Sequence, residues 1–174
     1  AKQSAFELGV DMIDLLYFHR PDPKIPYGES CEAMKEIRSM GIAREIGISN
    51  ASIEQIDIAR EILGDSLIAV QNQFSPIYTE TADTLDYCGK VGLSFVCWSP
   101  LGGFRKPKDE SKFDPFREVA EAHGVSYQQV VLAWELAKGS HVFVIPGAHR
   151  PATILDSLKA GDLELTPEEL AKLG

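Results

Sequence analysis

Short apolar runs that end in polar or turn-forming residues recur along this chain. They cover residues 14–18, 43–48, 67–70, 93–98 and 142–145. Such runs are typical of strands buried in a parallel sheet, because both faces of that sheet are covered. Since parallel strands end at one edge, the residue that follows each run is delivered to a shared rim. We therefore expect five buried strands that point the same way and build one site at their carboxyl ends.

Helical patterns separate these runs. Capping residues and apolar spacings of three or four predict helices at 1–8, 29–40, 53–63, 79–91, 116–123 and 151–158, one after Ser126 and a short one after Thr166. Capping boxes are expected at Ser52 with Gln55 and at Thr166 with Glu169. Residues 100–112 contain two adjacent glycines and two prolines, which predict a loop.

Three of the helices have a clear apolar face. The helix at 53–63 is expected to bury Ile53, Ile56, Ala59 and Leu63. The helix at 29–40 is expected to bury Cys31, Met34, Ile37 and Met40. The helix after Ser126 is expected to bury Val130, Ala133, Trp134 and Ala137.

Strands that alternate with helices imply right-handed βαβ units and a parallel sheet. The two candidate architectures are an open doubly wound sheet and a (β/α)₈ barrel. A doubly wound sheet should carry a glycine fingerprint after its first strand, and residues 19–23 carry none, so the barrel is favoured. A closed barrel has eight strands. We therefore predict an α/β TIM barrel of which this chain holds about five C-terminal βα units, as a single domain over 1–174 with a tail helix within 162–174.

Composition narrows the function classes. The net charge of −9 argues against a nucleic-acid surface, and no apolar run approaches the length of a membrane span. Cys31, Cys88 and Cys97 have neither metal-ligand spacing nor a disulfide pattern, so we expect no metal and a reduced, cytoplasmic setting. The chain begins without Met in what looks like the last turns of a helix, and we expect that it begins mid-fold.

Three strand ends carry polar groups with two interpretations each. His19 is either a histidine bonded to a neighbouring carbonyl or a catalytic group. Ser49 and Asn50 are good turn residues, and they could also bind a carboxamide. Gln71 could pair with the same amide, whereas Asn72 could be only a turn former.

The last two strand ends suit a nucleotide. Trp98 offers a flat face to an aromatic heterocycle, and the small residues after it let backbone amides approach a phosphate. The alternative is a core tryptophan followed by a glycine turn. Residues 145–151 open a helix whose first amides favour anions, with His149 and Arg150 as nearby donors, or they form a plain strand-to-helix turn.

Together these strings resemble the aldo-keto reductase superfamily. The matching strings are residues 8–15 running into 19–21, then 47–50, 70–72, 98–102 and 145–147, in the family's order. The resemblance implies a (β/α)₈ barrel and NADPH-dependent reduction of a small-molecule aldehyde or ketone to an alcohol. Of the family's Asp, Tyr, Lys and His tetrad, His19 matches the histidine that orients the carbonyl. The other three precede it in the family, and we expect this chain to lack them.

The resemblance also implies a set of residues that bind NADP(H). Ser49, Asn50 and Gln71 match the nicotinamide carboxamide site, and Trp98 matches the residue that stacks on the nicotinamide ring. The remaining matches are Ser99, Pro100, Leu101 and Gly102 for the pyrophosphate, Ile145, Pro146 and Gly147 for the adenosine phosphate, Arg150 for the 2′-phosphate, and Asp156 and Ser157 for the adenine. Asp156 and Ser157 stand where the family often has Glu and Asn. Thr153 stands where some members have Arg.

Two further readings stay open. The chain could be a non-catalytic, nucleotide-binding or regulatory barrel subunit, or a fragment without a function of its own. Unpaired edges at the strands 14–18 and 142–145 are expected to promote self-association, because open strands recruit partners.

Overall fold

The computed structural model describes residues 1–103 and 110–174. Within them the chain divides into two compact units, which are described separately. The first unit comprises Ala1–Asn72 and Asp86–Phe95, and the second comprises Gln73–Leu85 and Val96–Gly174. The expected single domain stays a prediction.

The strands alternate with the helices as predicted. They are β1 (Ile13–Phe18), β2 (Ala43–Ser49), β3 (Leu67–Gln73), β4 (Ser94–Trp98) and β5 (Val142–Ile145). They follow one another in the sheet in chain order, and the pairs β1–β2 and β2–β3 are parallel. Tyr17 lies opposite Gly47, and Ser49 lies opposite Gln71. This register brings the carboxyl ends of three strands level with one another.

The helices occupy the predicted places. They are α1 (Lys2–Leu8), α2 (Tyr27–Ser39), α3 (Ile53–Leu63), α4 (Ala82–Val91), α5 (Asp114–His123), α6 (Tyr127–Leu136), α7 (Pro151–Leu158) and α8 (Pro167–Leu173). Short 3₁₀ turns cover Gly64–Ser66, Glu110–Phe113 and Lys159–Asp162. Both predicted capping boxes are present, at Ser52 with Gln55 and at Thr166 with Glu169. The predicted loop 100–112 includes residues 104–109, which lie outside the described residues, and ends in a 3₁₀ turn.

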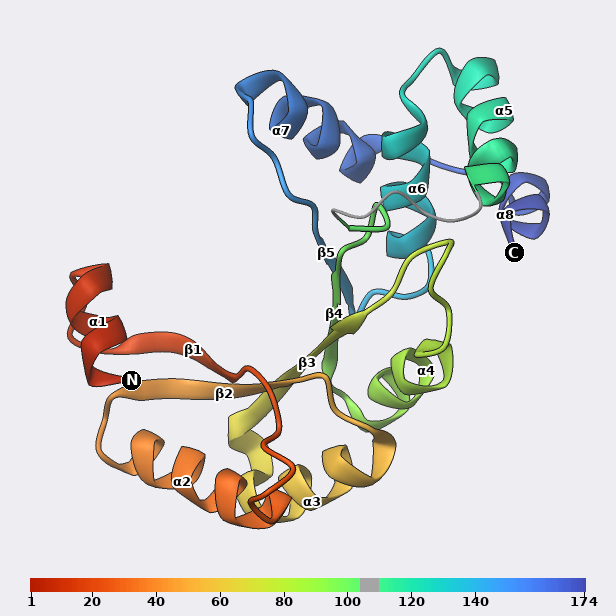
Figure 1. The fold of residues 1–174 in the computed structure, drawn as a ribbon. Coiled ribbons are helices and arrows are strands. Elements are labelled where there is room, and N and C mark those ends of the chain that lie inside the picture. The colour runs from red at the N-terminus through yellow and green to blue at the C-terminus, as the bar shows by residue number, and fades with distance from the viewer. Residues whose placement is uncertain (104–109) are drawn as a thin grey trace. The chain divides into compact units, whose positions relative to one another are not determined.

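In the first unit, α2 and α3 lie side by side along one face of the strands (Figure 1). Ile46 and Ile48 of β2 are fully buried, as are Cys31 of α2 and Ile56 of α3. Alternate residues of a strand point to opposite faces, so Gly47 and Ser49 lie on the other face of β2. That second face carries the candidate site residues of this unit.

The second unit is built around aromatic rings. Trp134 of α6 stacks on Phe74 at a centroid distance of 5.6 Å and meets Phe116 of α5 edge-on at 5.5 Å. Its indole Nε1 donates to the backbone carbonyl oxygen of Gly174 over 2.7 Å, and this bond ties the end of α8 to α6. Figure 1 shows α5, α6 and α8 gathered together.

The two outer strands are less buried than the sequence predicts. Only Ile13 of β1 and only Val142 of β5 are buried, whereas Phe143 is 52% exposed. These strands end the strand order, and a terminal strand has a neighbour on one side only. The expectation of five buried strands was therefore wrong for β1 and β5.

Smaller differences concern boundaries and helix faces. β3 continues to Gln73, so Gln71 and Asn72 lie inside the strand rather than after it. Met40 lies beyond the end of α2 and is 58% exposed, and Ala137 is exposed beyond the end of α6. α6 is instead buried nearly all round, and its buried residues include Glu135.

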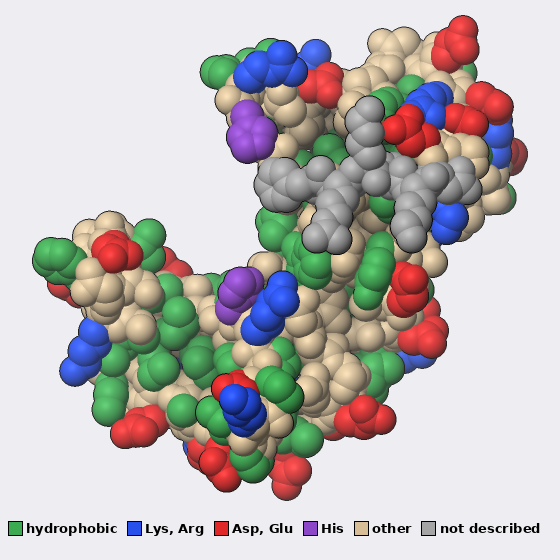
Figure 2. Space-filling model, in the orientation of Figure 1, with side chains coloured by type: hydrophobic (Ala, Val, Ile, Leu, Met, Phe, Trp, Pro, Cys, Tyr) green, Lys and Arg blue, Asp and Glu red, His purple; other side chains and the backbone are tan. Residues whose placement is uncertain are grey.

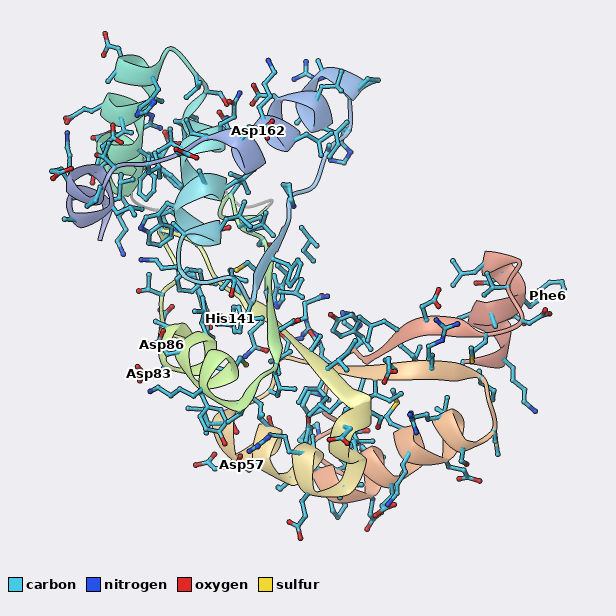
Figure 3. All side chains as sticks on the ribbon, turned by 180° about the vertical axis from the view of Figure 1, so that it is seen from behind. Phe6, Asp57, Asp83, Asp86, His141 and Asp162 are labelled. Atoms are coloured by element: carbon cyan, nitrogen blue, oxygen red, sulfur yellow. The ribbon has the colours of Figure 1, made fainter. Side chains whose placement is uncertain are left out.

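Exposed apolar side chains gather on α1. Phe6 is 79% exposed and Leu8 is 65% exposed, and Figure 2 shows hydrophobic side chains over α1 and β1. Phe6 projects from the outer side of its helix in Figure 3. In the part of the chain that the structure describes, no helix is both long enough and apolar enough to cross a membrane.

Candidate functional site

The first unit brings four predicted site residues together at the carboxyl ends of β1, β2 and β3. His19 follows β1, Ser49 and Asn50 end and follow β2, and Gln71 lies opposite Ser49 in β3. His19 is exposed, whereas Ser49 is 2% exposed. These four residues thus lie together in this unit, and the single site built by all five strand ends stays a prediction.

Hydrogen bonds connect the ends of β1, β2 and β3. The Ser49 hydroxyl donates to the Gln71 backbone carbonyl oxygen over 2.7 Å, and the Asn50 backbone N–H donates to the same oxygen over 3.0 Å. Asn50 Nδ2 donates to the backbone carbonyl oxygen of His19 and to Ser49 Oγ, each over 3.1 Å. Because a carbonyl oxygen can only accept, the bond to His19 determines which way the Asn50 amide is turned.

This network decides what the rim can offer to a ligand. The single hydroxyl hydrogen of Ser49 is used by the Gln71 carbonyl oxygen. Both hydrogens of Asn50 Nδ2 are used within the protein, which leaves Oδ1 as the group that this amide can present. At Ser49 and Asn50 the rim therefore presents acceptors, which suit a ligand that carries N–H donors.

The sequence reasoning missed Tyr17. It lies two residues before His19 and so on the same face of β1. Burial raises the pKa of its phenol above the ordinary value, and the neighbouring Gln71 side chain lowers that pKa by a smaller amount. Period-two alternation along 14–19 was the signal that could have grouped Tyr17 with His19.

Asn72 has a purely structural role in this unit. Its Oδ1 accepts from the backbone N–H of Ala51 over 3.0 Å, and its Nδ2 donates to the Ala51 carbonyl oxygen over 2.8 Å. The residue is 4% exposed and lies within β3. It is not a turn former, because its amide instead satisfies both backbone groups of the residue that follows Asn50.

Two site residues hold a left-handed backbone. Asn50 has φ 57° and Ser99 has φ 52°, and they are the only non-glycine residues with positive φ among those described. Each follows the last residue of a strand, β2 and β4 respectively. Such conformations carry a cost and concentrate at functional sites. This observation supports the predicted function of both strand ends.

The second unit contains a cleft of about 400 Å³ where β4 and β5 end. It is lined by Trp98, Ser99, Pro100, Leu101, Gly103, Ile145, Pro146, Gly147 and His149. Seven of these nine residues belong to the predicted cofactor set, and the nine come from two segments that are more than 40 residues apart. The fold therefore brings these two segments of the second unit to one place.

Gly102 shapes the turn that leads out of this cleft. Its N–H donates to the Ser99 carbonyl oxygen over 2.9 Å, and its φ is +88°. A Cβ atom at this position would lie 2.8 Å from Cδ1 of Ile77. Glycine is thus needed here for its backbone conformation, whereas the contact with Ile77 involves the far end of a flexible side chain, which can shift.

A second cleft of about 310 Å³ lies at the start of α7 and shares Leu101 with the first. Its other lining residues are Gln128, Arg150, Ala152, Thr153, Asp156 and Ser157. The Asp156 carboxylate accepts from Ser126 Oγ and from Gln129 Nε2, each over 2.6 Å. These bonds hold Asp156 against the first turn of α6.

The residues of the second unit fit a dinucleotide phosphate. Trp98 contributes a half-buried indole whose Nε1 is buried, and that atom has no hydrogen-bond partner among the described residues. Arg150 is an exposed guanidinium at the N-cap of α7, where cations and helix amides together favour a phosphate. The two clefts, which share Leu101, thus contain an aromatic side chain, the backbone of a glycine turn and a cation.

The model of the aldo/keto reductase family matches residues 1–174. Curated relatives include 6-dehydroglucose reductase of Novosphingobium aromaticivorans, 32% identical, and methylglyoxal reductase DkgB of Salmonella typhimurium, 31% identical. These matches cover 90% and 97% of this chain, and 54% and 61% of the relatives. The chain thus spans a little more than half of the length of these curated relatives.

Solved structures show the same likeness. A thermostable aldo-keto reductase in complex with the inhibitor epalrestat has a TM-score of 0.91 at 30% identity, and the match covers 99% of this chain and 62% of that one. A Bombyx mori aldo-keto reductase in complex with NADP has a TM-score of 0.84 at 25% identity, with 99% and 60% covered. The predicted fold class, part of an α/β TIM barrel, is confirmed.

Proposed function

Because the chain belongs to the aldo/keto reductase family of oxidoreductases, we propose that it carries the nicotinamide-nucleotide-binding part of an NADPH-dependent reductase. Its substrate class is an aldehyde or a ketone, which is reduced to an alcohol. The observation that carries this proposal is the pair of adjoining clefts in the second unit, which are lined by most of the residues expected to bind the cofactor.

Each predicted residue has a chemical task in this proposal. Trp98 provides a wall for the nicotinamide ring, the turn from Ser99 to Gly102 suits the pyrophosphate, and Arg150 suits the 2′-phosphate. The bound cofactor would supply the hydride, and the protein supplies orientation. His19 is the donor expected to orient the substrate carbonyl and to stabilise the negative charge that develops on its oxygen. Related proteins solved with NADPH and with NADP support the choice of cofactor.

Cofactor titration tests the binding part of the proposal. We expect NADPH to quench the intrinsic fluorescence of the protein and to bind more tightly than NADH. Arg150→Ala should weaken NADPH binding by about 10-fold, because a charge-assisted bond to the 2′-phosphate is lost, and should leave NADH binding unchanged. Lys159→Ala removes an exposed cation from the other end of α7 and serves as the matched control. Equal loss for both nucleotides in Arg150→Ala would contradict the assignment of the 2′-phosphate.

A carbonyl-reduction assay separates catalysis from binding. We expect the 174 residues by themselves to bind NADPH with little or no turnover, because the matched motifs include only the histidine of the family tetrad. Rapid reduction of a generic aldehyde by this chain would refute that expectation. Binding without turnover by the protein at its natural length would favour the non-catalytic, regulatory alternative.

Self-association and location remain parts of the proposal. Among the described residues, β1 and β5 end the strand order, so the outer edge of each can pair with another chain. We expect light scattering to show species larger than a monomer, and a strictly monomeric protein would count against this. A cytoplasmic location is consistent with three buried, unpaired cysteines.

A further inference from the structure

Gln128 lines the second cleft of the second unit and is not among the residues predicted to bind the cofactor. It is the second residue of α6, which packs against α7, the helix that supplies Asp156 to the same cleft (Figure 1). Consecutive residues of a helix point about 100° apart, so Gln128 and its neighbour Gln129 have different surroundings. Gln129 is 4% exposed, whereas Gln128 is half-buried. Of these two amides, Gln128 is the one that lines the cleft.

The carboxylate of Asp156 is fixed in place, and it can serve only one kind of ligand group. Its Oδ2 accepts from Ser126 Oγ and its Oδ1 accepts from Gln129 Nε2, each over 2.6 Å. An ionised carboxylate has no hydrogen to donate, so its remaining lone pairs can bind only a donor on the ligand. A ligand that also carries an acceptor therefore needs a second side chain in this cleft.

The Gln128 amide can supply that second group. Within residues 1–103 and 110–174, its side chain forms no hydrogen bond. A glutamine amide presents an N–H₂ donor and a carbonyl acceptor side by side, so it can bind a ligand edge that has one acceptor next to one donor. Among the described residues that line the cleft, it is the only amide side chain.

Adenine matches this pair of side chains. Its edge carries the N7 acceptor beside the N6 amino group, and a glutamine amide can bind both atoms at once. The second amino hydrogen suits the Asp156 carboxylate, which can only accept. Arg150 of the same cleft suits a phosphate, so the base and the phosphate have separate partners. The cleft volume of about 310 Å³ lies at the lower end of the range for small-ligand sites, about 300–1,000 Å³.

We propose that Gln128 is a specificity residue that selects adenine as the base of the bound nucleotide, through hydrogen bonds to N7 and to the N6 amino group. This inference rests on the proposed function, because that function supplies the nucleotide. Hypoxanthine carries an acceptor oxygen in place of the amino group, so it would face the Gln128 oxygen and the Asp156 carboxylate without a hydrogen to donate. The preference for adenine therefore depends on a residue that lies outside the strand-end motifs.

The test compares NADPH with reduced nicotinamide hypoxanthine dinucleotide phosphate on the full chain. We expect the unsubstituted chain to bind NADPH more tightly than this analogue. Gln128→Met keeps the length of the side chain and removes both hydrogen-bonding groups, so NADPH should bind at least about 5-fold more weakly. The analogue loses the bond at N7 but also a repulsion between two oxygens, so its affinity should change by a smaller factor. The ratio of the two affinities should therefore fall in Gln128→Met.

Gln3→Ala removes an exposed amide from α1 in the first unit and serves as the matched control, for which both affinities should keep their original values. Equal affinities of the unsubstituted chain for the two nucleotides would overturn the inference, and so would an unchanged NADPH affinity in Gln128→Met. Equal losses for both nucleotides would also overturn it, because they would indicate general damage to the cleft. If the unsubstituted chain binds neither nucleotide, the proposed function itself fails, and that result differs from the others.

Discussion

The side-chain amide of Asn50 donates a hydrogen bond to the backbone carbonyl oxygen of His19 over 3.1 Å. This bond joins the ends of β1 and β2, which are 31 residues apart in the sequence. Asn50 can make it because its backbone is left-handed, with φ 57°, a conformation that asparagine tolerates better than most residues. The position of the candidate catalytic histidine thus depends on a neighbouring residue that was itself expected to bind the cofactor.

The first prediction concerns this bond. Asn50→Gly keeps the left-handed backbone and loses the donor, so it should lower the free energy of unfolding by about 1 kcal/mol or less. Asn50→Asp should cost about 1–2 kcal/mol, because a carboxylate would face the His19 carbonyl oxygen without a hydrogen to donate. Urea denaturation at pH 7 measures both values. If Asn50→Asp were as stable as the original chain, the bond would make no contribution to the free energy of unfolding.

The second prediction concerns Glu135, which is fully buried in α6. Neither carboxylate oxygen has a hydrogen-bond partner among the described residues, and burial raises the pKa of this carboxyl well above its ordinary value of 4.5. The native state therefore keeps a proton that the unfolded state loses as the pH rises above 4.5. Stability should fall from that pH upward and level off above the native pKa. Denaturation curves between pH 5 and pH 8 measure this slope.

Substitutions at Glu135 sharpen that prediction. Glu135→Gln should flatten the slope, because it removes the titrating group. Glu135→Leu should raise the free energy of unfolding at pH 8 by about 1–3 kcal/mol, the cost of an unpaired buried polar group. Glu121→Gln changes an exposed carboxylate of the neighbouring helix α5 and is the matched control. A slope that survives in Glu135→Gln would assign the pH dependence to other groups.

The third prediction concerns Ser126, whose hydroxyl forms hydrogen bonds with two residues. Its Oγ accepts from the Gln129 backbone N–H over 3.2 Å as an N-cap, and it donates to Asp156 over 2.6 Å. Ser126→Ala should therefore lower stability by about 1–2 kcal/mol. Ser126→Asn can keep both bonds, whereas Ser126→Asp caps the helix but sets a second carboxylate against Asp156.

The comparison of Asn and Asp at position 126 isolates the charge. We expect Ser126→Asp to be the less stable of the two at pH 7, and the difference to shrink as the pH falls toward about 4, where carboxylates take up protons. Thermal denaturation at both pH values measures it. Equal melting temperatures at pH 7 would mean that Asp156 does not interact with this position.

The fourth prediction concerns the three cysteines. All three are fully buried, and burial raises the pKa of the Cys31 thiol to about 11 and that of Cys88 to about 12. Since the thiolate is the reactive form, a thiol reagent at pH 8 should react slowly with the native chain. In a denaturant all three thiols should react at once. Rapid reaction of one thiol in the native chain would show that the region around it opens.

Much of the fold could be read from local patterns. The predicted bounds of α3, β5 and α7 agree with the structure, and the capping boxes at Ser52 and Thr166 are present. Most residues that line the two clefts were also predicted to bind the cofactor, because they follow strand ends or lie in glycine turns. Helix periodicity, caps and turns are set by residues a few positions apart, and a sequence displays such neighbours directly.

Only the structure showed the contacts and the burial that depend on which residues of a neighbouring strand lie opposite. The register places Tyr17 opposite Gly47, where a side chain would collide with the tyrosine ring, and Asn72 bonds to Ala51 across 21 positions of sequence. The half-buried state of β1 and the full burial of Glu135 likewise depend on which elements surround them. The amino-acid sequence by itself determined the alternation of strands and helices, the caps, and the family with its strand-end motifs. Only the tertiary structure decided which side-chain donors remain available to a ligand. The reason is that hydrogen bonds between segments distant in sequence occupy donors, such as those of Ser49 and Asn50, whose partners the sequence does not show.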